Sequence, residues 1–190
     1  MRVFILGTGR CGTMTMTEAF RHADNYTSGH ETKAESFYDP LEYPDWHIES
    51  DSRLVWFLGE LDRAYPDALY IHLIRKREQF VRSVVARGAD IDYGPRSILR
   101  AFGASVLQQG ERFLEHPDEV AGRLWDVVNT NVEVFLRDKR HLTIWLHELT
   151  DRFPEVWDFV GAEGDLQAAL AETRRRHNRG RVKQRARPPA

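Results

Sequence analysis

The stretch Val3-Phe-Ile-Leu-Gly-Thr-Gly-Arg-Cys-Gly-Thr13 decides the fold class, because a short apolar run passes through a glycine-rich loop into a predicted helix. We expect a strand over residues 3–6 and a helix over residues 13–22. The backbone N–H groups of the loop and of the helix N-terminus then surround one point, an arrangement that binds phosphate groups. The alternative is a tight strand-to-helix turn without a ligand.

Two further apolar runs extend this pattern. Residues 68–74 and 142–146 are too short for buried helices and are predicted to be strands, each followed by a helix, over residues 77–87 and 151–160. Strands that alternate with helices indicate an α/β fold with a parallel sheet covered on both faces.

The segments between these units are less regular. Amphipathic patterns over residues 98–113 and 120–135 predict two helices packed on the core. Residues 27–52 lack periodicity, so we expect mostly loop, of the kind that forms a substrate lid or a binding loop.

Composition favours one globular domain. The chain has 190 residues, 42% of them hydrophobic and 29% charged. Its apolar runs fall far short of the ~20 residues that cross a bilayer, and no secretory signal is visible, so we expect no membrane span and a cytoplasmic location. Cys11 is the only cysteine, which excludes an internal disulfide, and no spacing of potential ligands predicts a metal site.

The C-terminus has its own charge. Residues 174–190 contain eight Arg or Lys and no acid, so the rest of the chain is acidic. Such a tail either binds an anionic group or folds back on the acidic body. We expect the domain to span residues 1–184 and residues 185–190 to form a disordered basic tail. We do not expect nucleic acid to be a partner.

The glycine loop differs from two common nucleotide-binding motifs. Gly12 is followed directly by Thr13 without the lysine of a Walker A sequence, which disfavours a magnesium-dependent kinase. The glycine spacing matches a dinucleotide fingerprint, but Asp24 and Glu31 fit the required ribose-binding acid poorly.

A second motif lies at the end of the strand over residues 68–74. Arg75 follows the strand directly, and Ser83 lies eight residues later on the next helix, opposite its apolar face. A guanidinium and a hydroxyl in these positions can converge on one phosphate group. The alternative is a solvated, arginine-rich helix surface.

Together the two motifs resemble the signatures of the PAPS-dependent sulfotransferases, which use 3′-phosphoadenosine 5′-phosphosulfate. Arg10-Cys-Gly-Thr13 is similar to the family's 5′-phosphosulfate loop, Arg75 with Ser83 to its 3′-phosphate signature, and Asn178-Arg-Gly180 to its closing loop. The resemblance implies a P-loop NTPase-like sulfotransferase fold, adenosine 3′,5′-bisphosphate as product and no metal. The donor-binding residues that it implies are Gly9, Arg10, Cys11, Gly12, Thr13, Met14, Arg75, Ser83, Arg179 and Gly180.

The sequence departs from the family at three positions. Cys11 replaces a usual Ser, Met14 replaces a common hydroxyl, and Arg77 stands where Pro is frequent. Backbone donors or Thr15 could compensate for Met14. Cys11 is expected to be a packed or loop thiol. The alternative is that its place beside Arg10 at a helix start lowers its pKa and makes the thiol reactive.

The resemblance places the catalytic base between the two phosphate motifs. Glu31 or His30 matches by position and type, and the choice between them stays open. Arg10 would stabilise charge on the leaving phosphate. His47, Glu49 and Asp51 in the predicted loop are weaker candidates, whereas a core position is expected for His72. The acceptor would be a hydroxyl or amine of a small molecule or carbohydrate.

Two alternative functions remain at this point. One is a P-loop-type kinase of a small molecule. The other is a nucleotide- or polyanion-binding module without catalysis that uses the basic tail.

Overall fold

The central strand of the sheet is β1 (Arg2–Leu6), formed by the branched and aromatic residues near the start of the chain. In the computed structural model, which describes residues 1–34, 41–94 and 97–175, β1 pairs with β3 (His47–Ser50) and β4 (Leu69–Ile74). With β2 (Thr27–His30) and β5 (His141–Trp145) at the edges, the strand order is β2-β3-β1-β4-β5. All pairs are parallel, which confirms the predicted α/β fold class.

The strand order determines where a ligand would bind. After β1 the chain runs to the edge strand β2, returns to β3 between β2 and β1, and then crosses β1 to add β4 and β5 on the other side. The carboxyl ends of all the strands therefore lie at one edge, and the order reverses at β1. Ligands of open α/β sheets bind outside such a reversal point.

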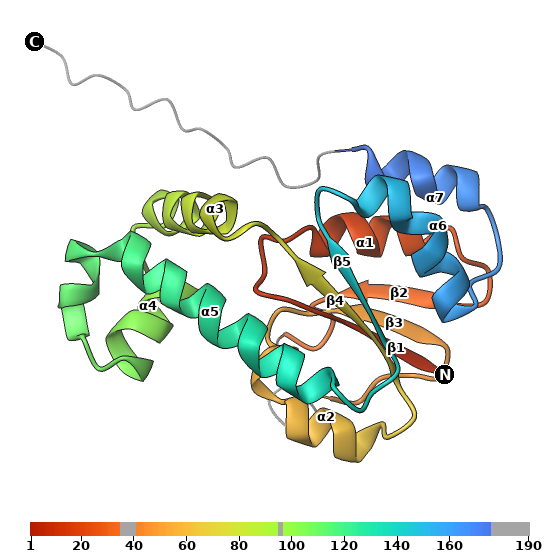
Figure 1. The fold of residues 1–190 in the computed structure, drawn as a ribbon, viewed down its shortest axis with the longest axis horizontal. Coiled ribbons are helices and arrows are strands. Elements are labelled where there is room, and N and C mark those ends of the chain that lie inside the picture. Colours follow the sequence, from red (N-terminus) through yellow and green to blue (C-terminus); the bar gives the residue numbers. More distant parts are fainter. Residues whose placement is uncertain (35–40, 95–96, 176–190) are drawn as a thin grey trace, which may run out of the picture.

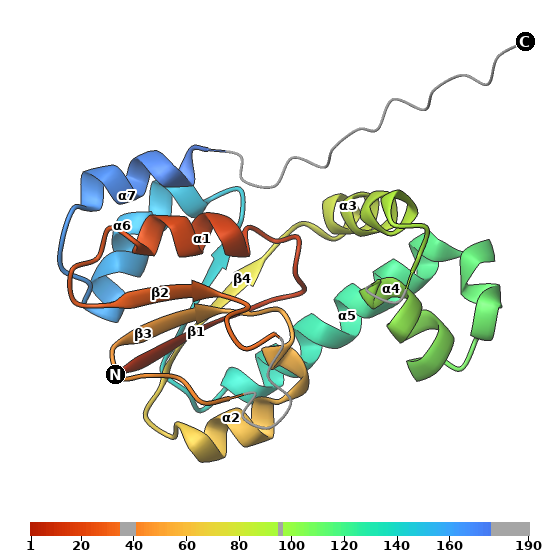
Figure 2. The ribbon, with the colours of Figure 1, turned by 180° about the vertical axis from the view of Figure 1, so that it is seen from behind.

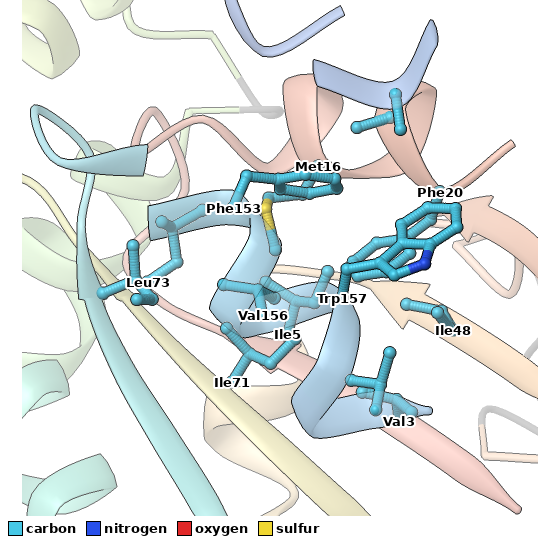
Figure 3. Packing of buried hydrophobic residues seen from close by; sticks show 14 of the residues in the cluster. Val3, Ile5, Met16, Phe20, Ile48, Ile71, Leu73, Phe153, Val156 and Trp157 are labelled. Carbon is cyan, nitrogen blue, oxygen red and sulfur yellow. The ribbon is translucent and has the colours of Figure 1, made fainter. Parts of the chain in front are cut away.

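One face of the sheet is covered by α1 (Thr13–Phe20), α6 (Leu149–Val160) and α7 (Leu166–Thr173), as Figures 1 and 2 show. Alternate strand residues point into this layer and form one core with the apolar stripes of the helices. Phe20 stacks on Trp157 in it, with 5.9 Å between ring centroids (Figure 3). The packing fixes α1, and with it the loop that precedes it.

The other face is covered by α2 (Leu58–Ala64) and the long α5 (Pro117–Leu136), which form a second core. The N-terminal part of α5 extends past the edge of the sheet at which the strands end, and α3 (Arg77–Asp90) packs against it there (Figure 1). Arg77 Nε and Nη2 donate to the Asp126 carboxylate at 2.8 and 3.0 Å across this contact. One side of α3 is thereby held beside the strand ends.

The prediction of a single helix over residues 98–113 is wrong. The α-helical part, α4, is only Ile98–Arg100, followed by the π-helical η2 (Ala101–Val106) and the 3₁₀-helix η3 (Gly110–Glu115). The chain folds back because Gly103 leaves room for Phe113: a Cβ at Gly103 would lie 2.7 Å from Phe113 Cβ. The apolar pattern therefore comes from three short helical pieces that bury Leu99, Phe102 and Phe113, and not from one continuous helix.

The loop predicted over residues 27–52 is also wrong at its two ends, where β2 and β3 form. All four residues of β3 are buried although three are polar. His47 Nε2 lies 2.9 Å from Glu49 Oε2, and Thr32 donates to Glu49 from its N–H and its hydroxyl at 3.0 and 2.6 Å. Burial raises the pKa of Glu49, but these hydrogen bonds outweigh it and lower the pKa below its usual value.

His72 is a core residue, as predicted. It is buried in β4, and its Nε2 lies 3.0 Å from Asn129 Oδ1 of α5. Burial disfavours the imidazolium ion and lowers the pKa of His72 to about 4, whereas a histidine in the unfolded chain titrates near ~6.5.

This pKa difference predicts a pH-dependent stability. Between pH ~4 and ~6.5 the unfolded state binds more protons, so the free energy of unfolding should fall as the pH falls, by on the order of 3 kcal/mol at most. His72→Gln keeps an amide donor for Asn129 but removes the titration, and should flatten this part of the curve. Urea unfolding of both proteins at several pH values measures the effect. Parallel curves for the two proteins would contradict it.

The described chain ends at Arg175, two residues after α7. The proposed domain boundary after residue 184, together with Arg179 and Gly180, lies outside the described residues. None of the described helices is both long and apolar enough to cross a membrane.

Candidate functional site

A cleft of about 1260 Å³ opens at the carboxyl-end edge of the sheet. Each strand end contributes to its lining: Thr8 follows β1, Glu31 follows β2, Ser52 follows β3, Arg75 follows β4 and Leu146 follows β5. The starts of α1 and α6, one side of α3, and parts of α4 and α5 also line the cleft, together with residues 53, 55, 56 and 173–175. The cleft thus occupies the place that the strand order predicts for a ligand.

The loop between β1 and α1 has the geometry of an anion-binding nest. Gly9, Arg10 and Gly12 have φ angles of +70°, +52° and +101°, which turn successive N–H groups toward one side. A Cβ at Gly7 would lie 2.5 Å from the carbonyl oxygen of Leu73, so the neighbouring strand requires glycine there. No described side chain caps α1, and its first N–H groups stay available to a ligand.

The two sequence motifs meet in the cleft. Arg75 Nη1 donates to the carbonyl oxygen of Arg10 at 2.8 Å, and Arg10 Nε donates to Ser83 Oγ at 3.3 Å. Trp125, on α5, donates from its Nε1 to the carbonyl oxygen of Arg75 at 2.9 Å. The strand-end arginine, the glycine loop and α3 therefore form one connected unit.

Arg75 is incompletely paired within this unit. Its Nε is buried and has no hydrogen-bond partner among the described residues. Burial lowers the pKa of Arg75, and the nearby charge of Arg10 lowers it further. An anion beside this guanidinium would supply both the missing acceptor and the missing countercharge.

The described lining of the cleft is strongly cationic. It includes one acid, Glu31, and six arginines, which are Arg10, Arg53, Arg75, Arg87, Arg174 and Arg175. Two of these have carboxylate partners, since Arg53 pairs with Asp51 and Arg175 with Glu172. The remaining excess of positive charge suits a ligand with more than one negative charge.

Both candidate bases line the cleft at the end of β2. His30 Nε2 lies 3.1 Å from Thr13 Oγ1 of the glycine loop. Glu31 Oε1 accepts a hydrogen bond from Ser52 Oγ at 3.2 Å. The structure therefore brings a carboxylate and an imidazole to the side of the anion-binding loop, each fixed by a neighbouring hydroxyl.

The other base candidates lie differently. His47 and Glu49 are buried and paired with each other, and Asp51 is buried and holds Arg53. They do not line the cleft. The described structure therefore does not place these three weaker candidates in the cleft.

Of the predicted donor-binding residues, Gly9, Arg10, Gly12, Thr13, Met14, Arg75 and Ser83 line the cleft. Cys11 does not: it is fully buried beneath the loop. Burial raises the pKa of Cys11 to about 12, so the expected packing is confirmed and the lowered pKa is wrong. The charge of Arg75 lowers this pKa, but by less than burial raises it.

An inert Cys11 is a testable consequence. At pH 8 a thiol of pKa about 12 is almost entirely protonated, and we expect the folded protein to react with a thiol reagent at least ~10³-fold more slowly than the unfolded chain. Because Cys11 is the only cysteine, the total absorbance change reports it alone. Equal rates with and without denaturant would show an accessible thiol.

Several lining residues were not predicted from the sequence. Ser52 and Trp56 belong to the turn after β3 and Ile98 to α4, and neither segment contains a motif. Trp125 does not line the cleft, but its indole N–H donates to the carbonyl oxygen of Arg75. Ser52 lies two residues after the end of β3. A prediction of β3 from the sequence would have placed Ser52 at the edge of the sheet where ligands bind. Among the described residues, no group of three or more His, Cys, Asp or Glu is placed to hold a metal ion.

Comparison with known proteins identifies the fold. The sequence matches no protein-family model and no curated protein. A sulfotransferase domain from the curacin biosynthetic pathway superposes with a TM-score of 0.67 and 14% sequence identity, over 92% of this chain and 78% of that domain. A sulfotransferase from Alicyclobacillus acidocaldarius gives a TM-score of 0.58 and 14% identity, over 86% of this chain and 83% of that one. The protein therefore has the fold of the sulfotransferases.

Proposed function

We propose that this protein is a sulfotransferase that moves a sulfuryl group from PAPS to a hydroxyl or amine of an acceptor, leaving adenosine 3′,5′-bisphosphate. The observation that carries the proposal is the junction of Arg75, Arg10 and Ser83 inside a cationic cleft. Two anion-binding elements that adjoin one another suit a ligand with two separate phosphate groups better than a ligand with one.

The residues of the cleft fit such a donor. The N–H groups of the glycine loop and the hydroxyl of Thr13 would hold the 5′-phosphosulfate. Arg75 and Ser83 would hold the 3′-phosphate, and Arg75 has a buried donor without a partner in the described chain. Arg174 and Arg175 line the cleft after α7 and add positive charge there.

The donor would supply an activated sulfuryl group, and the protein would supply positioning and charge stabilisation. A base next to the glycine loop would take the proton of the acceptor, a role that Glu31 and His30 are placed to fill. Arg10 and the loop N–H groups would stabilise the negative charge that develops on the leaving phosphate.

Calorimetric titration tests the nucleotide specificity. We expect adenosine 3′,5′-bisphosphate to bind without magnesium, and ATP with magnesium to bind much more weakly because it has no 3′-phosphate for Arg75 and Ser83. Preference for ATP with magnesium would favour a kinase.

Turnover separates an enzyme from a binding module. PAPS is incubated with a panel of hydroxyl and amine acceptors, and the bisphosphate that is released is measured by chromatography. We expect the bisphosphate to be released faster with the protein than without it. Tight binding of the bisphosphate without turnover on any acceptor class would contradict the catalytic part of the proposal.

A further inference from the structure

The cleft has a second wall whose chemistry is different. It is apolar and comes from η1 (Leu54–Trp56), α4 with η2, and α5. Its residues are Val55, Trp56, Ile98, Ala101, Leu124 and Val128. From this wall we infer that the acceptor is an alcohol or phenol with an apolar body at least as large as one aromatic ring, an inference that rests on the proposed function.

Two side chains of this wall are unusually exposed. Trp56 and Ile98 are large apolar residues, yet 42% and 41% of their surfaces are accessible to solvent, and both face into the cleft lining. Single exposed apolar residues are common on protein surfaces, but apolar residues grouped inside one cleft mark a binding surface. A ligand that covers them would remove apolar area from water.

The wall is anchored in the second core. Three of its residues, Val55, Leu124 and Val128, are largely buried and also belong to the apolar cluster under α2 and α5. The ring of Trp56 lies 6.4 Å from that of Phe102, between centroids, with an interplanar angle of 35°. The surface is therefore built before any ligand arrives, which lowers the entropy cost of binding.

The wall begins next to the candidate base. Ser52, which donates to Glu31, lies four residues before Trp56, and the N–H of Leu54 donates to the carbonyl oxygen of Asp51 at 3.1 Å. This turn places the apolar wall directly after the residue that fixes the carboxylate. An acceptor on the wall could thus present its hydroxyl to Glu31.

Charge and hydrogen-bonding groups are scarce on this side. Arg53 is turned to Asp51, which accepts from its backbone N–H and its guanidinium, and the Ser97 hydroxyl accepts from the backbone N–H of Arg100 at 3.3 Å. The six described residues of the wall itself are all apolar, and the arginines of the cleft belong to other segments of its lining. A sugar, with several hydroxyls to satisfy, would lose more hydrogen bonds to water here than it could replace.

Acceptor binding can be measured without turnover. The protein is saturated with adenosine 3′,5′-bisphosphate and titrated with 2-naphthol or with methyl glucoside in a calorimeter. We expect saturable binding of 2-naphthol and none of the glucoside. Trp56→Ala should weaken naphthol binding by at least about tenfold, because it removes the largest apolar surface of the wall. Ile98→Ala should weaken it less, in proportion to the smaller area.

The controls separate this inference from the proposed function. Val134→Ala removes an equally exposed apolar side chain, 50% accessible, on α5 and outside the cleft, and should leave naphthol affinity unchanged. Unchanged bisphosphate affinity shows that each variant is folded. Absence of saturable naphthol binding, tighter binding of the glucoside, or an unchanged affinity in Trp56→Ala would overturn the inference. If the bisphosphate itself does not bind, the proposed function fails, and the same naphthol titration of the free protein still tests the apolar wall.

Discussion

Arg75→Ala should weaken the binding of adenosine 3′,5′-bisphosphate roughly 30- to 1000-fold, which corresponds to about 2–4 kcal/mol. The substitution removes a partly buried guanidinium and the hydrogen bond that it donates to the carbonyl oxygen of Arg10. It therefore removes both the proposed contact to the 3′-phosphate and a support of the glycine loop. Ser83→Ala, which removes one neutral hydroxyl, should cost only about 0.5–1.5 kcal/mol.

Two further variants locate the cause. Arg75→Lys keeps the charge but not the planar fork, and should recover part of the lost affinity. Arg63→Ala removes an exposed arginine of α2 that does not line the cleft, and should leave calorimetric affinity unchanged. Wild-type affinity in both Arg75→Ala and Ser83→Ala would contradict the assignment of the 3′-phosphate site.

The strands that decide the fold could be predicted because they are apolar on both sides. The strands expected over residues 3–6, 68–74 and 142–146 are found as β1, β4 and β5, with bounds that differ by one residue at most. β1 and β4 are buried between two helical layers, and such strands show continuous apolar runs that are visible without knowledge of their neighbours. β5 is an edge strand in which only Ile144 is fully buried, but it too contains a short apolar run. The parallel sheet followed from them.

The remaining elements depend on contacts that the sequence does not display. β3 contains three buried polar residues, and one of them, Glu49, accepts hydrogen bonds from Thr32, 17 residues earlier in the chain, and lies against His47 of its own strand. The shorter helices α2 and α7 were not predicted, since seven or eight residues span barely two helical turns. Tertiary contacts, not local preference, fix these elements.

The same division holds in the site. The meeting of Arg10 with Arg75 and Ser83 could be expected, because both motifs follow strands that were predicted to share a sheet. β1 and β4 are paired strands, so the loop after β1 and the arginine after β4 lie next to each other. Cys11 shows the opposite case. Its local sequence indicates a low pKa, but burial beneath the loop outweighs the nearby positive charge.

Glu31→Gln should lower the rate of sulfuryl transfer by about 10²- to 10⁴-fold, while bisphosphate affinity stays near that of the wild type. Glutamine can still accept the hydrogen bond from Ser52 but cannot take a proton. We favour Glu31 over His30 as the base because His30 Nε2 is engaged with Thr13, a residue of the loop proposed to hold the donor. His30→Ala should therefore weaken donor binding and lower the transfer rate by less.

Single-turnover rates and bisphosphate titrations of both variants distinguish the two residues. A transfer rate that collapses in His30→Ala with unchanged bisphosphate affinity, together with a nearly normal rate in Glu31→Gln, would make the imidazole the base. Nearly normal rates in both variants would contradict a base at the end of β2. Such a result would not make His47, Glu49 or Asp51 the base, because these side chains are buried and already paired. Catalysis would then rest on the positioning and charge stabilisation provided by the loop and its arginines.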